Sequence, residues 1–396
     1  MLRYSSLPFY QYDYCGENII LTPNMNKRKM RVLLVSAKVR AGGEAAHVTA
    51  LAKEFLKKGI DVSLLSTDPT GGMMAGIIPE DKLFFTEFRD HNPLQTAMNT
   101  AAIRKVLSEH AFDIIHCHGR DNAFAVRMAG PKQPYVYTCH SMSVQTDFMH
   151  RMLNSTGDAA IAVSGDTKEF MIRELKIPEE KITVIENGVD PTQLRKLTEG
   201  EKRWLYTNYL IPEGKIVAAI HGRIDPRKNH IMIGKALANL PEDERSKFVI
   251  LCSGIREVPG YDPLVSQLRE LGVLQQFRFT GWTEPRNILG CADLLLGPSQ
   301  TESFMMSALE GFFMDIPVIR SKTGGYSEMK DLCIGIDADD LKGWTEILHR
   351  VAVRGTDDMK PMVDTAHSEA LRRFTSEAMA AKVYRVYREV LRGRGR

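Results

Sequence analysis

The sequence has no cysteine pair at metal-site spacing, no long apolar run and little net charge. Its six cysteines lie far apart, most of them in apolar stretches, and none belongs to a Cys-x-x-Cys motif. This usage indicates buried, reduced thiols and therefore a cytoplasmic protein. No apolar run reaches the roughly 18 residues that a membrane-spanning helix needs. A net charge of +3 on 396 residues favours no nucleic-acid partner.

The length allows two domains, and the 43% hydrophobic and 26% charged content is that of an ordinary globular protein. The start of the chain differs from the rest. Residues 1–24 are aromatic and polar, without the basic start and apolar core of a secretion signal. Met25 resembles an ordinary bacterial start just before the first strand. We interpret residues 1–29 as an N-terminal extension that is dispensable.

Strands alternate with helices through residues 30–195. This alternation predicts a parallel sheet with helices on both faces, whose ligands gather at the carboxyl ends of the strands. The expected helices include Ala45–Lys58 and Pro93–Glu109. The expected strands are Met30–Ser36, Asp61–Ser66, Leu83–Phe88, Asp113–His118, Tyr135–His140, Ala159–Ser164 and Ile182–Ile185.

Two features at these strand ends are candidates for ligand contact. Gly42 and Gly43 follow the first strand and would let backbone approach a ligand closely, although a tight strand-to-helix turn explains them as well. The loop does not match G-x-G-x-x-G, so a dinucleotide site is weakly supported. His116 and His118 share one face of a strand, a pattern that metal ligands also show. No carboxylate or cysteine cluster completes such a site at metal-like spacing, so we expect hydrogen-bonded histidines and no metal.

The α/β pattern restarts after a polar crossing over residues 191–213. A strand over Ile216–Ile220 leads into a loop that carries Arg223 and Lys228. Five residues apart on a turn, the two cations could both reach one diphosphate, arginine as a fork and lysine as a point charge. A solvated basic loop is the alternative.

The most informative stretch runs from Gly297 to Pro317. Glu302 lies at the edge of a Pro-Ser loop, and Glu310 lies within an apolar run that begins at Phe304 and predicts a buried helix. A buried carboxylate is costly without a partner, and a ligand hydroxyl is one partner that could satisfy it. Eight helical residues span about 12 Å at about 1.5 Å per residue, and the helix N-terminus between the carboxylates would face a diphosphate. By itself the pair carries no signal among 49 acidic residues, since one exposed and one structural glutamate explain it equally well.

The surroundings of this stretch resemble the signature of the retaining glycosyltransferases of family 4, which have the GT-B fold. The resemblance rests on Pro298–Ser299, the apolar helix, and the segments 316–319 and 323–328, and it extends over nearly the whole chain after Met30. It implies two Rossmann-like α/β domains whose parallel sheets face each other across a cleft. Residues 30–195 would bind the acceptor and residues 200–370 the donor. Residues 371–396 would form a helix that packs back on the first domain.

The resemblance also implies roles for individual residues. His140 and Glu302 would contact the donor sugar, and Arg223 and Lys228 would hold the leaving diphosphate, so that no metal or cofactor is needed. Glu310 would bind the ribose hydroxyls. The donor nucleotide site would further include Gly254, Trp282, Thr283, Phe304 and Met305, and the acceptor and diphosphate loop would be Gly42 and Gly43.

The expected function is transfer of a sugar from a nucleotide diphosphate sugar, which is UDP-linked in most of the family. The acceptor would be a sugar, a lipid-linked molecule or a small molecule. The expected role is in bacterial cell-envelope polysaccharide or glycoconjugate synthesis. Ser303 and Met305 stand where many members have glycine, and their side chains narrow the space beside the sugar. Two alternative functions therefore stay open. These are a non-catalytic partner protein that binds sugar nucleotides and a GT-B nucleotide-sugar epimerase. The basic end at Arg392–Arg396 could touch anionic lipid on the inner face of the membrane, or be solvated.

Overall fold

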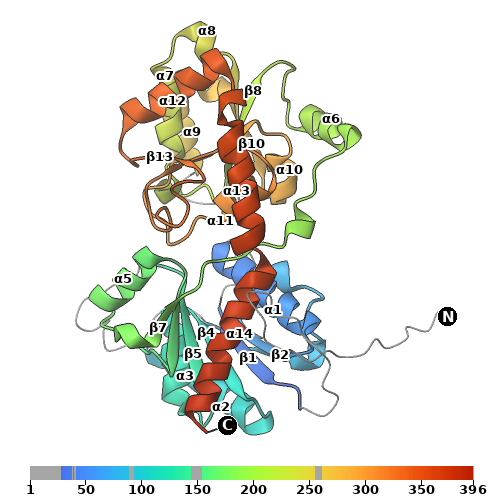
Figure 1. Cartoon of the computed structure of the whole chain (residues 1–396), viewed down its shortest axis with the longest axis vertical. Coiled ribbons are helices and arrows are strands. Elements are labelled where there is room, and N and C mark those ends of the chain that lie inside the picture. The colour runs from blue at the N-terminus through green and yellow to red at the C-terminus, as the bar shows by residue number, and fades with distance from the viewer. Residues whose placement is uncertain are drawn as a thin grey trace, which may run out of the picture.

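The computed structural model describes residues 28–37, 39, 42–88, 93–143, 154–254 and 261–395. It shows two lobes, each built on its own parallel β-sheet (Figure 1). Most of the extension expected at residues 1–29 lies outside the described residues. No helix in the described ranges combines the length and the apolar character that crossing a bilayer requires.

The N-terminal lobe holds a seven-stranded sheet in the order β3-β2-β1-β4-β5-β6-β7. Its strands are β1 (Arg31–Ser36), β2 (Asp61–Ser66), β3 (Leu83–Phe85), β4 (Ile114–His118), β5 (Tyr135–Cys139), β6 (Ala159–Ala162) and β7 (Ile182–Val184). Its helices are α1 (Gly43–Lys57), α2 (Pro93–Glu109), α3 (Arg120–Ala129), α5 (Gly165–Arg173) and the short 3-10 turns Gly72–Met74, Glu80–Lys82, Glu179–Lys181 and Pro191–Gln193. The central strands are buried on both faces, as expected of continuous apolar strands in a covered parallel sheet.

The C-terminal lobe repeats this plan with a six-stranded sheet in the order β10-β9-β8-β11-β12-β13. Its strands are β8 (Ile216–His221), β9 (Phe248–Ser253), β10 (Phe277–Gly281), β11 (Leu294–Gly297), β12 (Val318–Ser321) and β13 (Ile334–Ile336). Its helices are α6 (Glu199–Asn208), α7 (His230–Ala238), α8 (Glu242–Arg245), α9 (Tyr261–Glu270), α10 (Pro285–Leu289), α11 (Met306–Phe313), α12 (Leu341–Arg354) and α13 (Lys360–Arg373), with 3-10 turns at Pro226–Lys228, Leu274–Gln276 and Asp357–Met359. The α/β class predicted from the sequence is therefore confirmed.

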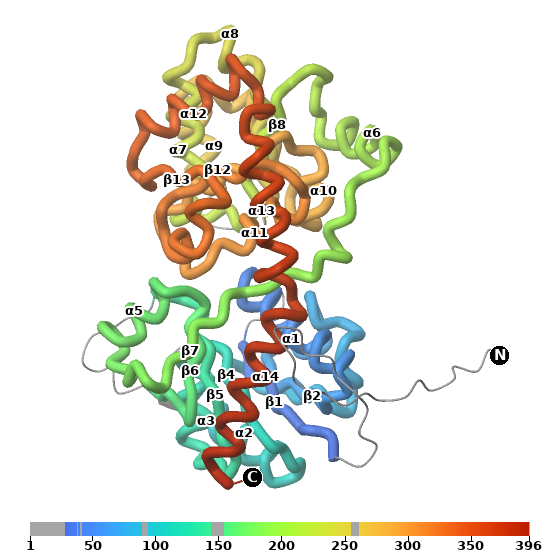
Figure 2. The backbone as a smooth tube through the Cα atoms, viewed as in Figure 1, coloured from blue at the N-terminus to red at the C-terminus, as the bar shows by residue number. Residues whose placement is uncertain are grey.

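The chain crosses between the lobes twice, and the two crossings lie side by side (Figure 2). Val189 forms an isolated parallel bridge with Thr375. A Cβ atom on Gly188 would lie 2.3 Å from the Thr375 carbonyl oxygen, so only glycine allows this approach. Close packing at this point fixes where one lobe sits relative to the other.

The last helix, α14 (Ser376–Gly393), leaves the C-terminal lobe and packs on α1 of the N-terminal lobe (Figure 1). Its apolar face buries Met379, Val383 and Tyr387 in the core that β1 and α1 form. Each such buried side chain contributes about 1.5–3 kcal/mol. The Tyr387 hydroxyl also lies 2.6 Å from Nδ1 of His116, so the helix is tied to the centre of the sheet as well as to its surface.

Candidate active site

The carboxyl edges of the two sheets face each other, and polar contacts join the lobes at one end of this cleft. An acidic side chain of the C-terminal lobe binds at the N-terminus of α5. The Gly165 backbone N–H donates a hydrogen bond to Glu328 Oε1 at 2.6 Å. In return Asp166 Oδ2 accepts from the Gly325 N–H at 2.8 Å. Negative charge at the start of a helix is favourable, so this pair stabilises the juxtaposition of the lobes.

Ser303, which by the sequence resemblance stands where glycine is common, contributes to the same junction. Its hydroxyl accepts a hydrogen bond from the Met142 backbone N–H at 3.1 Å, and its carbonyl accepts one from the Ser164 hydroxyl at 2.8 Å. The first of these bonds needs the serine side chain. The substitution therefore adds a contact between the lobes that glycine could not make.

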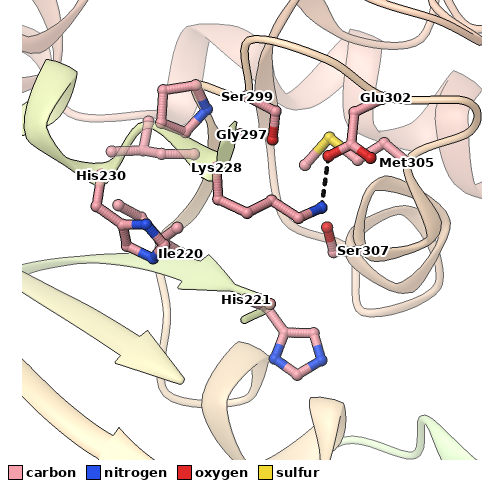
Figure 3. Close-up of a pocket in the computed structure, with 12 residues that line it drawn as sticks. Ile220, His221, Lys228, His230, Gly297, Ser299, Glu302, Met305 and Ser307 are labelled. Atoms are coloured by element: carbon pink, nitrogen blue, oxygen red, sulfur yellow. Dashed lines mark hydrogen bonds and ion pairs between the residues drawn. The ribbon is translucent and has the colours of Figure 1, made fainter. Parts of the chain in front are cut away.

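A pocket at the carboxyl edge of the C-terminal sheet brings together three of the residues singled out in the sequence, Lys228, Glu302 and Met305. Lys228 Nζ lies 2.6 Å from Glu302 Oε1 (Figure 3), and Glu302 is largely buried. Met305 and His221 also line the pocket. The space left between these side chains is about 10 Å³, close to what one water molecule needs. The side chains that line the pocket therefore leave little free space in this conformation.

The loop after β8 explains why Lys228 points inward. Gly222 has a φ of +148°, and Asp225 caps the turn Pro226–Lys228 by accepting from the Arg227 N–H. Asp225 also pairs with the Arg227 guanidinium at 2.9 Å, and this hydrogen bonding lowers the pKa of Asp225 to about 2. Arg227 is therefore held on the outer side, Arg223 is exposed on the same loop, and Lys228 enters the pocket.

Glu310 lies on α11 as a buried carboxylate. Its Oε2 atom has no hydrogen-bond partner in the described part of the chain and lies 3.5 Å from His221 Nε2. Burial raises the pKa of Glu310 to about 7, and burial together with Lys228 lowers the pKa of His221 to about 4. A buried oxygen without a donor is rare in folded proteins and marks a place for a ligand hydroxyl.

The helix that contains Glu310 begins later than predicted. Its first residue is Met306, so Phe304 and Met305 precede it. Phe304 packs edge-on against Phe374 in the core, and Met305 fills the space in front of Gly297. Glu302 is therefore a loop residue. The prediction that one helix spans about 12 Å between Glu302 and Glu310 is wrong.

The other residues expected at the nucleotide do not line this pocket. Gly254 lies against the loop after β8, where a Cβ atom would come within 2.4 Å of the Gly222 carbonyl oxygen. Trp282 is 64% exposed, and the Thr283 hydroxyl is 3.1 Å from the Tyr209 hydroxyl. Gly254 and Trp282 directly follow the strands β9 and β10, so they lie at the carboxyl edge of the same sheet.

The glycine loop and the histidines form the opposite side of the cleft. Gly42, with a φ of +102°, precedes α1, and a Cβ atom on Gly43 would lie 3.5 Å from Met306 of the other lobe. His118 Nδ1 lies 3.0 Å from His140 Nε2, so the two histidines from neighbouring strand ends meet. His116 is structural, since both of its ring nitrogens are hydrogen-bonded, one to Tyr387 and one to Thr138.

The sequence did not single out His47, although it joins this group. It lies one turn into α1, where its neighbours are apolar and the pattern indicates only a core position. Its ring lies edge-on to His140 with the centroids 4.7 Å apart. Burial lowers the pKa of His47 to about 4 and also lowers that of His118, so both rings are neutral near pH 7. In the sequence, the one feature that could have pointed to His47 was its position four residues after Gly43.

Two family models match this chain. The model for Glycosyltransferase Family 4 matches residues 41–193, and the model for Glycosyl transferases group 1 matches residues 206–331. Together they cover most of the described fold. The chain belongs to the GT-B glycosyltransferases of family 4.

Individual relatives agree with this assignment at low identity. A D-inositol 3-phosphate glycosyltransferase of Saccharomonospora viridis is 24% identical, with 89% of this chain and 90% of the relative covered. Among solved structures, a glycosyltransferase of Rickettsia africae has a TM-score of 0.77 at 21% identity, covering 92% of this chain and 99% of the other. Anabaena Alr3699/HepE in complex with UDP and glucose has a TM-score of 0.76 at 19% identity, covering 91% and 100%. Both solved structures share the fold of this chain.

Proposed function

We propose that this glycosyltransferase moves a sugar from a UDP-linked donor to an acceptor, with retention of anomeric configuration and without a metal ion. The observation that carries the proposal is the pocket at the carboxyl edge of the C-terminal sheet. Lys228 and its paired carboxylate Glu302 lie in this pocket. His221, which also lines it, lies 3.5 Å from Glu310, the buried carboxylate without a hydrogen-bond donor. This set suits the diphosphate, the sugar and the ribose of a nucleotide sugar.

Donor binding has to open the pocket. A diphosphate carries more negative charge than Glu302, so it competes with that carboxylate for Lys228. Once displaced, Glu302 is free to accept a hydrogen bond from a hydroxyl of the donor sugar. The Met305 side chain must move as well, since it occupies the space beside the pair.

Glu310 supplies the contact to the ribose. Two neighbouring ribose hydroxyls donate hydrogen bonds, and the carboxylate has an oxygen that lacks a donor. Such bonds favour the ionised form and lower the pKa of Glu310 from its raised value in the free protein. Nucleotide binding near pH 7 is therefore coupled to release of a proton.

The transfer step breaks the bond between the anomeric carbon and the diphosphate oxygen, and the electron pair stays on the diphosphate. The acceptor hydroxyl oxygen forms the new bond to the anomeric carbon, and its proton passes to the leaving diphosphate. Lys228, Arg223 and the first turn of α11 stabilise the charge that develops there. His140 hydrogen-bonds the donor sugar from the other lobe, and the acceptor enters beside Gly42 and Gly43. Retention without an enzymic nucleophile is the family's pattern, and we propose it for this chain by resemblance.

The choice of UDP rests on the same resemblance and on Alr3699/HepE, the protein of similar fold that was solved with UDP and glucose. We further propose a role in bacterial envelope polysaccharide or glycoconjugate synthesis in the cytoplasm. Contact of the basic tail with anionic lipid would be weak, because Arg394 donates to Asp158 of the N-terminal lobe at 2.7 Å. That pairing leaves fewer charges for a membrane surface.

The test is a thermal-shift panel of nucleotide sugars, followed by mass spectrometry of the products with acceptors of several classes. The expected result is a stabilising nucleotide sugar that adds one sugar to an acceptor and leaves the nucleoside diphosphate. Binding without any product would instead support a partner protein. An isomerised or hydrolysed donor in the absence of acceptor would support an epimerase.

A further inference from the structure

Three histidines of the N-terminal lobe meet at the edge of its sheet that faces the cleft. His47 comes from α1, His118 from the end of β4 and His140 from the residue after β5. One ring nitrogen from each lies within 4.8 Å of the other two, and the His118–His140 pair is at 3.0 Å. The proposed transfer reaction uses only His140 of this group.

The hydrogen bonds around His47 leave one of its nitrogens unused. The Asn187 side-chain oxygen can only accept, and it lies 2.8 Å from Nδ1, so Nδ1 carries the proton. The lone pair is then on Nε2, which is buried and has no hydrogen-bond partner among the described residues. His47 is fully buried.

His118 is fully buried, and its Nδ1 is the nitrogen that faces this group, 3.0 Å from His140 Nε2. His116 on the same strand provides the contrast, since both of its nitrogens are satisfied. Buried nitrogens without partners are rare in native proteins and call for an explanation such as a bound ion.

We propose that His47, His118 and His140 bind a divalent transition-metal ion, with Zn²⁺ as the best match. Three imidazoles without a nearby thiolate suit zinc, whereas Mg²⁺ and Ca²⁺ prefer oxygen ligands. Zinc–nitrogen bonds of about 2.0–2.1 Å place tetrahedral ligand atoms about 3.3 Å apart. The His118–His140 pair is close to that spacing, and a small shift of the His47 ring would complete the set.

The fourth coordination position faces the cleft, because His140 is the partly exposed member of the three. A metal ion there would occupy the His140 lone pair and inhibit sugar transfer. This inhibition rests on the proposed function, while metal binding itself does not. Asn187 fixes the ring of His47 and acts as a positioning residue for the site.

The test uses the untagged full-length chain, equilibrated with Co²⁺ and followed by the visible absorption of tetrahedral cobalt. Bound zinc is counted separately by plasma mass spectrometry after dialysis. The variants are His47→Ala, His140→Ala and Asn187→Ala. His349→Asn is the matched control, because this exposed histidine pairs with Glu244 in the other lobe. Melting curves with and without Zn²⁺ show whether each variant folds.

The expected result is one tetrahedral metal ion per wild-type chain and a rise in melting temperature with zinc. Both signals should be retained in His349→Asn and lost in His47→Ala and His140→Ala. Asn187→Ala should weaken binding by about 10–100-fold. A wild-type chain without tetrahedral cobalt, or a signal that survives both alanine substitutions in folded protein, would overturn the proposal.

Activity assays then separate the two proposals. Metal binding without any sugar transfer would leave the site standing and contradict the proposed function alone. Transfer that continues at full rate with the site occupied would overturn the inferred competition for His140.

Discussion

The two sides of the cleft use different chemistry. The C-terminal side carries full charges that compensate one another, with Lys228 paired to Glu302 over a nearly closed space. The N-terminal side carries imidazoles that burial keeps neutral. The fixed positive charge of Lys228 therefore lies where, in our proposal, a leaving diphosphate would need it. The neutral side can hydrogen-bond a sugar without competing for the phosphate.

Removing the positive charge should have the largest effect. Arg223→Ala and Lys228→Ala should each lower kcat by about 10²–10³-fold, corresponding to roughly 3–4 kcal/mol, because the charge on the diphosphate is fully developed only as the bond breaks. Steady-state kinetics with the identified donor measures this. Arg227→Ala is the control, since Arg227 is already paired with Asp225 outside the pocket. Equal losses in all three variants would contradict the separate role of Lys228 and Arg223.

Changing Glu310 should alter binding more than rate. Glu310→Gln should raise the donor KM by about tenfold, in line with one hydrogen bond to a charged group, and leave kcat nearly unchanged. The wild-type KM should also rise as the pH falls from 8 to 6, because the pKa of Glu310 is about 7 and its ionised form binds the ribose. The glutamine variant should lose this dependence. A KM that falls with acidification would refute the ribose contact.

The same raised pKa predicts how stability varies with pH. The folded state holds the Glu310 proton more tightly than the unfolded state, so its contribution is favourable at low pH and is lost as the pH rises from about 4.5 to about 7. Glu310→Gln should therefore gain melting temperature relative to wild type between pH 5 and pH 8. Melting curves across that range test the sign.

A substitution at the junction between the lobes should have a smaller effect than the substitutions at Arg223, Lys228 and Glu310. Ser303→Ala removes the hydrogen bond from the Met142 backbone and should cost about 0.5–1.5 kcal/mol of stability, with a donor KM changed by less than tenfold. Thermal melting and kinetics measure the two effects. A variant indistinguishable from wild type in both would show that this bond does not hold the lobes together.

Chelation should have the smallest effect. In metal-free protein EDTA should leave turnover unchanged, because Lys228 and Arg223 supply the positive charge. In protein loaded with zinc at the histidine cluster, EDTA should raise turnover. The assay compares initial rates before and after dialysis against EDTA. Lost activity that Mg²⁺ or Mn²⁺ restores would overturn the assignment of the two cations.

The sequence was most informative where local pattern decides structure. Buried parallel strands are continuous apolar runs, so both sheets could be predicted, as could the loop that presents Lys228. Helix α6 was missed inside the polar crossing, although Thr198 and Glu201 form a capping box at its start. The polar composition of this segment led to the prediction of a linker, whereas the capping box marks the start of the helix.

Contacts between distant segments could not be read in this way. Ser303 was noted as a missing glycine, and nothing in the sequence indicated that its hydroxyl meets Met142, which lies in the other lobe. His47 looked like a core residue because its partners, Asn187 and His140, come from other elements. The pairing of Lys228 with Glu302 likewise depends on how two loops of one lobe converge.

The central claim is that the diphosphate takes Lys228 from Glu302, and the affinity for UDP alone tests it most directly. Calorimetry on wild type, Lys228→Ala and Glu302→Gln should show weaker binding for the lysine variant. Glu302→Gln should bind UDP more tightly than wild type, because its lysine no longer has a competing partner. Unchanged affinity in both variants, or weaker binding in Glu302→Gln, would contradict the claim.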